Sequence, residues 1–210
     1  MAVDDGAKIH ETDFCAQVAG WAQQVLDAQP GLPFIAVRIE GLGPKSKKRT
    51  DLRFIDRGGK IVLCGEVKLP GTLEGHSPYN DDLVKDAATK ADNLGCRYFF
   101  TWNVNRLVLF DRQKYDVPPL DRRIKDWSLG LQLSKPADVG RPDVLAYVRD
   151  KFLPGFLSEF AEIFLERKPD WGMPPDDIFI KSLESHLEWP MLLTRDWLAV
   201  ESERDRTFSL

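Results

Sequence analysis

The sequence predicts an α/β domain built on a mixed central sheet flanked by helices, with a helical extension after it. Three observations predict this class. Apolar residues recur at helical spacing near the N-terminus, three short β-rich runs follow them, and a second amphipathic helical pattern separates those runs from two further apolar runs. The predicted order of the core elements is therefore helix, three strands, helix and two strands.

The first half of this core contains one helix and three strands. Helical spacing of the apolar residues predicts the helix over residues 11–26, and the sequence QPGLP ends it. The sequence FIAVRI predicts a strand over residues 34–39. Residues 51–55 and 60–68 predict a hairpin, because the DRGG between them supplies glycine for a tight turn.

The second half of the core contains one helix and two strands. The sequence DDLVKDAATKADNL predicts a helix over residues 81–94, since it has acidic residues at its start and Gly95 after its end. The sequences CRYFFTWN and RLVLFD predict two more strands on either side of VN. Residues 1–111 are thus predicted to form the core.

The remaining residues are predicted to form a connection and an extension. Residues 112–140 contain the turn-forming sequences DVPPLDRR and LSKPADVGRP, which predict a turn-rich connection. Residues 141–210 have helical patterns at 142–166 and 176–188, and Pro154 is expected to kink or break the first of these helices. The extension is expected to pack on the core or to lead into further domains, and whether the chain is a fragment of a longer polypeptide stays open.

The composition is that of an ordinary globular protein. The 210 residues are 43% hydrophobic and 30% charged, and no apolar run approaches the roughly 20 residues that a membrane span needs. The N-terminal sequence lacks the apolar core of a secretory signal. Three widely separated cysteines favour a reducing compartment over a disulfide framework. The sequence thus predicts a cytoplasmic protein that does not contact a membrane.

The local distribution of charge differs from the net charge of −4. Residues 38–60 carry eight Lys or Arg and three Asp or Glu, a local balance of +5, whereas residues 161–210 have a local balance of −5. A basic stretch can bind phosphate even in an acidic chain, and a solvated loop is the other interpretation of this one. The residues predicted here to contact DNA phosphates are Lys45, Lys47, Lys48 and Arg49.

Charged residues of the predicted hairpin converge on one face. Side chains alternate along a strand, so Glu66 and Lys68 share a face, and the turn places Asp51 opposite residue 65 or 66. Two neighbouring carboxylates repel each other unless a cation lies between them, and Mg²⁺ takes hard oxygen ligands. The hairpin thus predicts a metal site, with Lys68 orienting or deprotonating a water or holding a phosphate. Exposed charges that protect an edge hairpin from aggregation are the other interpretation.

Asp51, fourteen intervening residues and the run Glu66-Val67-Lys68 resemble the PD-(D/E)XK nuclease signature, although Thr50 stands where the proline of that name would be. The predicted element order resembles the αβββαβ core of this restriction-endonuclease-like superfamily. The resemblance implies a Mg²⁺-dependent nuclease, with Mn²⁺ as a possible substitute. It also implies that Asp51 and Glu66 are metal ligands and that Lys68 is catalytic.

Two residues in the predicted helices are added to the candidate site. Several members of the superfamily use an acidic residue from the first helix, and Glu11 is the corresponding candidate here. An acid that favours a helix N-terminus is the other interpretation of Glu11. Lys90, on the second helix, is a candidate contact to DNA phosphate, and an ordinary exposed lysine is the alternative.

The run KADNLGCRYFFTWNVNRLVLFD further resembles the segment after the catalytic lysine in nuclease domains of restriction–modification polypeptides. This implies an endonuclease of a restriction–modification or related phage-defence system that acts on double-stranded DNA, and RNA stays open as a substrate. The sequence has no GxxxxGK[ST] motif for ATP and no methyltransferase motif, so methyltransferase or motor domains or subunits are the expected partners. The alternative is a catalytically silent module of the same fold that binds DNA or a protein partner.

Overall fold

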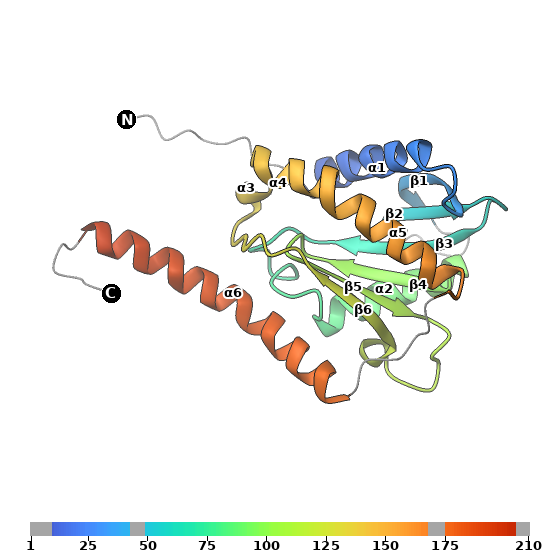
Figure 1. Cartoon of the computed structure of the whole chain (residues 1–210). Helices are drawn as coiled ribbons and strands as arrows, with labels where there is room; N and C mark the ends of the chain where they lie inside the picture. The colour runs from blue at the N-terminus through green and yellow to red at the C-terminus, as the bar shows by residue number, and fades with distance from the viewer. Residues whose placement is uncertain (1–9, 43–48, 168–174, 205–210) are drawn as a thin grey trace.

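The computed structural model of the protein describes residues 10–42, 49–167 and 175–204 (Figure 1). The strands are β1 (Phe34–Leu42), β2 (Arg49–Asp56), β3 (Ile61–Val67), β4 (Tyr98–Trp102), β5 (Arg106–Asp111) and β6 (Arg123–Ser128). The longer helices are α1 (Glu11–Ala28), α2 (Asp81–Leu94), α5 (Leu153–Phe164) and α6 (Pro175–Arg204). The shorter helical segments are η1 (Pro119–Arg122), α3 (Pro136–Val139), α4 (Pro142–Tyr147) and η2 (Val148–Phe152).

The six strands form one sheet in the order β1-β2-β3-β4-β5-β6. Strands β3 and β4 run parallel, because α2 carries the chain back between them, and the other neighbouring strands are antiparallel. The predicted mixed sheet and the order helix, three strands, helix and two strands are therefore confirmed.

The sixth strand, β6, lies in the segment that was expected to be only a turn-rich connection. It pairs antiparallel with β5, and Leu109 lies opposite Lys125. Its sequence RIKDWS has no alternation of apolar and polar residues, and most of its side chains are half-buried. This pattern is typical of an edge strand, where charged side chains discourage pairing with other chains. The expectation for residues 112–140 was thus incomplete, since this segment also extends the sheet.

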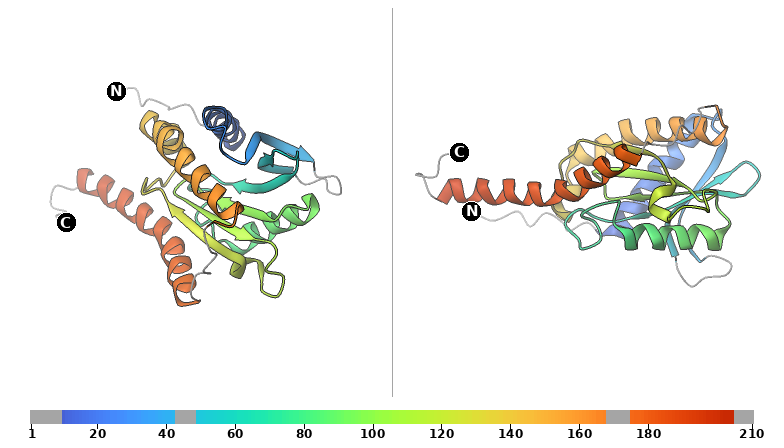
Figure 2. Two further views of the ribbon diagram at one scale, coloured as in Figure 1. Left: turned by 45° about the vertical axis from the view of Figure 1, so that its right-hand side comes forward. Right: turned by 90° about the horizontal axis from the view of Figure 1, so that it is seen from below.

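Helices cover both faces of the sheet, α1 and α5 on one face and α2 on the other (Figure 2). The larger core lies under α1, η2 and α5, where the Trp102 ring centroid is 5.4 Å from that of Phe14 and 5.2 Å from that of Phe152. The smaller core lies under α2, where Phe99 and Phe110 stack at 4.8 Å. Successive side chains of one strand therefore enter two different environments.

Gly65 determines how β3 packs on its neighbour. A Cβ at this position would lie 2.3 Å from ring carbons of the buried Phe100, so any other residue would displace that ring. Leu63 and Val67 lie on the same face of β3 as Gly65 and belong to the larger core. Glu66 therefore points to the opposite face, toward α2.

The C-terminal extension is helical, with two differences from the prediction. The helix predicted over residues 142–166 is divided into α4, η2 and α5, because the backbone changes to π-helical hydrogen bonding immediately before the turn that contains Pro154. The helix predicted over residues 176–188 continues to Arg204 as α6 and contains Pro190 within it.

Helix α6 contacts the sheet domain near its middle and projects away from it toward its C-terminal end (Figure 1). Ser185 Oγ lies 2.8 Å from Ser77 Oγ, and both serines are fully buried. Large apolar side chains on α6 are exposed, among them Phe179 at 68% and Met191 at 67%. Within the described part of the chain, no helix has both the length and the apolar composition needed to cross a membrane.

Candidate active site

The pairing of β2 with β3 brings Asp51 and Glu66 together. Leu52 lies opposite Gly65 in this antiparallel pair, so the next position of the same register places Asp51 opposite Glu66. Leu52 and Val67, which directly follow Asp51 and Glu66, belong to the core under α1 and α5. Because side chains alternate along a strand, those of Asp51 and Glu66 lie on the opposite face, which α2 covers. The two carboxylates that the sequence predicts as metal ligands are therefore neighbours in the structure.

Glu66 is almost completely buried, with an exposed fraction of 2%. Its Oε1 atom has no hydrogen-bond partner among the described residues. Burial, followed by the charge of Asp51, raises the pKa of Glu66 to about 8, although Lys90 opposes this shift. The site therefore favours a proton or a bound cation on this carboxyl group.

Lys90 supplies one cation to Glu66. Its Nζ lies 2.5 Å from Glu66 Oε2 and 2.8 Å from Asp86 Oδ2, and only 11% of its side chain is exposed. The expectation that Lys90 contacts DNA phosphate does not match this geometry, because its ammonium group faces a buried carboxylate. Lys85, on the same helix, is exposed and pairs with Asp81 instead.

Asp51 is held by the backbone of β3. Its Oδ2 accepts a hydrogen bond of 2.7 Å from the backbone N–H of Val67. This bond fixes the carboxylate beside the end of β3, and Lys68 is the next residue after that end. The charge of Asp51 also contributes to the raised pKa of Glu11, whose main cause is burial. The charge of Asp51 therefore raises the pKa of both Glu11 and Glu66.

Lys68 follows directly after β3 and reaches the start of α1. Its Nζ lies 3.0 Å from Glu11 Oε1, an ion pair between residues 57 positions apart in the sequence. Glu74, in the loop after β3, lies 3.6 Å from the same Nζ. Burial lowers the pKa of Lys68, but the neighbouring carboxylates, Glu11 first, raise it more, and the net shift is upward. Glu11 thus lies beside Lys68 and forms an ion pair with its ammonium group.

The residues present fit a hard divalent cation. Asp51 and Glu66 offer carboxylate oxygens from adjacent strands, and a cation between them would satisfy the unpartnered Oε1 of Glu66. Among the residues that the structure describes, no three His, Cys, Asp or Glu side chains are arranged to hold a metal. Mg²⁺ or Mn²⁺ would therefore have two protein ligands here, with waters and a substrate phosphate as the others.

The predicted DNA-binding loop is not placed by the structure. Lys45, Lys47 and Lys48 lie outside the described residues, and only the backbone of Arg49, at the start of β2, is described. Their contact with phosphate stays a prediction.

Two features of the site were missed by reasoning from sequence. Glu74 lies in an irregular loop, where no periodicity predicts its approach to Lys68. Arg38 and Arg53 are opposed on β1 and β2. Strand alternation alone indicates that Arg53 shares the face of Asp51, because the two are two residues apart. That Arg38 lies opposite Arg53 could be known only from the register of β1 with β2, which depends on the fold.

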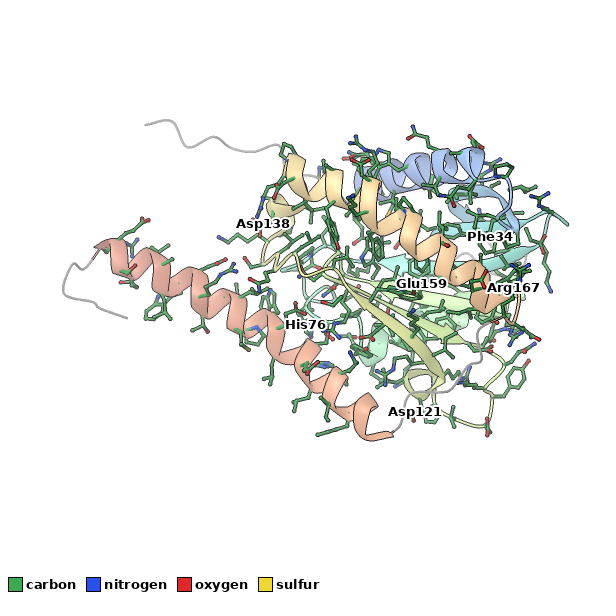
Figure 3. The ribbon with its side chains drawn as sticks, in the orientation of Figure 1. Phe34, His76, Asp121, Asp138, Glu159 and Arg167 are labelled. Atoms are coloured by element: carbon green, nitrogen blue, oxygen red, sulfur yellow. The ribbon has the colours of Figure 1, made fainter. Side chains whose placement is uncertain are left out.

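The loop after β3 also contacts α6. The ring of His76, labelled in Figure 3, lies 6.1 Å from the rings of both His186 and Trp189 of that helix. The same loop carries Glu74, which contacts Lys68. One short segment therefore lies between the candidate site and the C-terminal helix.

The element order and the sheet define a restriction-endonuclease-like fold. The structure is similar to that of the type IIG restriction endonuclease BpuSI, with a TM-score of 0.56 and 13% sequence identity. The similarity covers 79% of this chain and 18% of that one, so this chain spans only 18% of the length of BpuSI. Comparison of the sequence with protein-family models gives no match, and comparison with curated proteins gives none either.

The stability of the metal-free protein is expected to fall as the pH rises through the range in which Glu66 titrates. The pKa of Glu66 is raised from 4.5 to about 8 in the folded protein. Unfolding therefore releases a proton between these two pKa values, and each pH unit in this window lowers the free energy of unfolding by up to about 1.4 kcal/mol. Glu66→Gln cannot titrate and should lack this slope. Urea unfolding of both proteins in EDTA, from about pH 5 to about pH 9, measures the difference, and parallel pH profiles would contradict it.

Proposed function

We propose that this chain is a Mg²⁺-dependent nuclease domain of a restriction–modification or related phage-defence system, and that its substrate is double-stranded DNA. The observation that carries the proposal is the pairing of Asp51 with Glu66 on adjacent strands, with Lys68 directly after the second strand. The fold shared with a type IIG restriction endonuclease supports it. We expect the domain to act in the cytoplasm with methyltransferase or motor domains or subunits.

Each residue of the site has a defined task in this proposal. Asp51 and Glu66 would hold Mg²⁺, which would supply positive charge for the phosphate and for the attacking water. Lys68 stays protonated at neutral pH, since its pKa is raised. It therefore binds a phosphate oxygen or orients the water as a cation, and does not deprotonate the water. Glu11 and Glu74 hold its ammonium group in place.

Cleavage of plasmid DNA tests the proposal directly. Supercoiled plasmid incubated with the protein is expected to be nicked or linearised with Mg²⁺ or Mn²⁺ and to stay intact with EDTA. Linear duplex DNA, single-stranded DNA and RNA, tested in parallel, identify the substrate. Asp51→Asn and Glu66→Gln, which keep the shape of each side chain, should remove the activity. Metal-dependent cleavage that persists in both purified variants would overturn the assignment of the site.

One observation favours the alternative, a catalytically silent module of the same fold. Lys90 already pairs with Glu66 and places a positive charge beside one of the two proposed ligands. A module in which this ion pair excludes the metal would bind duplex DNA or a protein partner without cutting DNA. Isothermal titration with Mn²⁺ separates the two functions, because only the nuclease requires binding that depends on Asp51 and Glu66.

A further inference from the structure

Two arginines face each other on neighbouring strands at the edge of the sheet. Arg38 of β1 lies directly opposite Arg53 of β2. Like charges at such positions destabilise a sheet. Within the described residues neither arginine forms an ion pair: Arg38 donates only to the carbonyl of Val37, and the buried Nε of Arg53 has no hydrogen-bond partner. Among the described side chains, the two arginines at these opposed positions therefore have no acidic ion-pair partner that would normally stabilise them.

The pair lies on the same face of the sheet as the candidate active site. Arg53 stands between Leu52 and Phe54, which belong to the core under α1 and α5, so its side chain points to the opposite face. Asp51 is two residues before Arg53 on the same strand and shares this face. The distance between these two positions along a strand is about 7 Å.

Helix α2 covers only part of this face. The core beneath it takes residues from β3, β4, β5 and α2, and none of the described residues of β1 or β2 belongs to it. The side chain of Arg38 is exposed and that of Arg53 is half-buried. A ligand can therefore approach the two arginines from solvent, on the face of the sheet that also carries Asp51.

We propose that Arg38 and Arg53 form a phosphate-binding pair that holds the nucleic-acid backbone next to the phosphate that is cleaved. This inference rests on the proposed nuclease function. Arginine forks bind phosphate oxygens through two parallel hydrogen bonds, and a phosphate placed between the guanidinium groups removes their mutual repulsion. The carboxylates of Asp51 and Glu66 on the same face favour nucleic acid over an acidic protein as the ligand, because a metal ion there also binds phosphate.

Binding of a fluorescent DNA duplex by Arg38→Gln, Arg53→Gln and the double variant tests the pair. Measurements in EDTA prevent metal-dependent cleavage and are repeated over a series of salt concentrations. The double variant is expected to bind at least about tenfold more weakly at low salt. The slope of log K against log salt should fall by about 0.9, since the pair neutralises one phosphate and each neutralised phosphate contributes about 0.9. Arg38→Lys with Arg53→Lys should keep most of the slope, because the charges remain.

A matched control and a stability measurement complete the experiment. Arg149→Gln removes an exposed arginine of η2 that pairs with Asp150, and it should change neither affinity nor slope. The thermal midpoint of the double Gln variant should be equal to or above that of the wild type, because a like-charge contact is removed. A lower midpoint would show that the pair stabilises the fold and would contradict the inference.

The outcomes separate this inference from the proposed function. Unchanged affinity and unchanged salt slope in the double variant, with cleavage intact, would overturn the phosphate-binding pair alone. A ligand other than nucleic acid, such as an acidic protein, would give this same result. Failure of the wild-type protein to bind duplex DNA, single-stranded DNA and RNA would overturn both proposals.

Discussion

Replacing Lys68 with alanine is expected to lower the rate of Mg²⁺-dependent plasmid nicking by about 100-fold to 1,000-fold. Lys68 is the cation next to the two candidate metal ligands, and its raised pKa keeps it charged at neutral pH. It is also oriented before the substrate arrives, because Glu11 holds its Nζ at 3.0 Å. Loss of a preorganised charge at a reacting phosphate removes stabilisation of the transition state, whereas the fold loses one ion pair whose side chains are 21% and 31% exposed.

The control for this variant is Lys85→Ala. Lys85 lies on the exposed side of α2 and pairs with Asp81, so its removal should leave the cleavage rate and the circular dichroism spectrum unchanged. Lys68→Ala should also keep the wild-type spectrum. A nicking rate within about threefold of the wild type would show that Lys68 is not the catalytic cation, since removal of one such group has a much larger effect.

Lys90→Met is expected to lower the free energy of unfolding of the metal-free protein by about 3–5 kcal/mol near pH 9. At this pH Glu66 of the wild type is ionised, because its pKa is about 8, and Lys90 lowers that pKa. Without Lys90 the pKa of Glu66 rises, so its carboxyl group either is buried beside Asp51 with no counter-ion or takes up a proton, and either state costs free energy. Methionine keeps the length and the apolar part of the lysine side chain. Near pH 6 the loss should be smaller, since a proton then neutralises Glu66.

Three further measurements test this explanation by urea unfolding. Lys85→Met, on the same helix but exposed, should leave the stability unchanged within the error of the measurement. Adding Glu66→Gln to Lys90→Met should recover most of the lost stability, because no buried charge remains. Mn²⁺ should stabilise Lys90→Met more than the wild type, since the metal no longer competes with an ammonium group. Equal losses at both pH values would show that Lys90 stabilises the fold by packing and not by its charge.

The residues of the hairpin could be predicted because their placement depends on local rules. Strand alternation and the turn length place Asp51 opposite residue 65 or 66, and the register of β2 with β3 places it opposite Glu66. The glycines between the strands and the acidic start of α2 are likewise local signals. The fold class followed from the order of such local patterns.

The partners of the site residues could not be predicted, because they come from distant parts of the chain. Glu66 contacts Lys90, 24 residues later, and Lys68 contacts Glu11, 57 residues earlier. Sequence spacing indicates which face of α2 a lysine occupies but not which carboxylate that face meets. An exposed helical lysine and a lysine paired with a buried glutamate have the same local sequence pattern.

The sequence by itself determined the α/β class, the order of the first seven core elements down to β5, and the convergence of Asp51 with Glu66. These features depend on side-chain periodicity and on turn residues, which act over a few positions. Only the tertiary structure decided that β6 joins the sheet, that Lys90 pairs with Glu66 and that Arg38 opposes Arg53. These contacts depend on how elements pack and on the register between them, and burial then gives the same side chains different charges and partners.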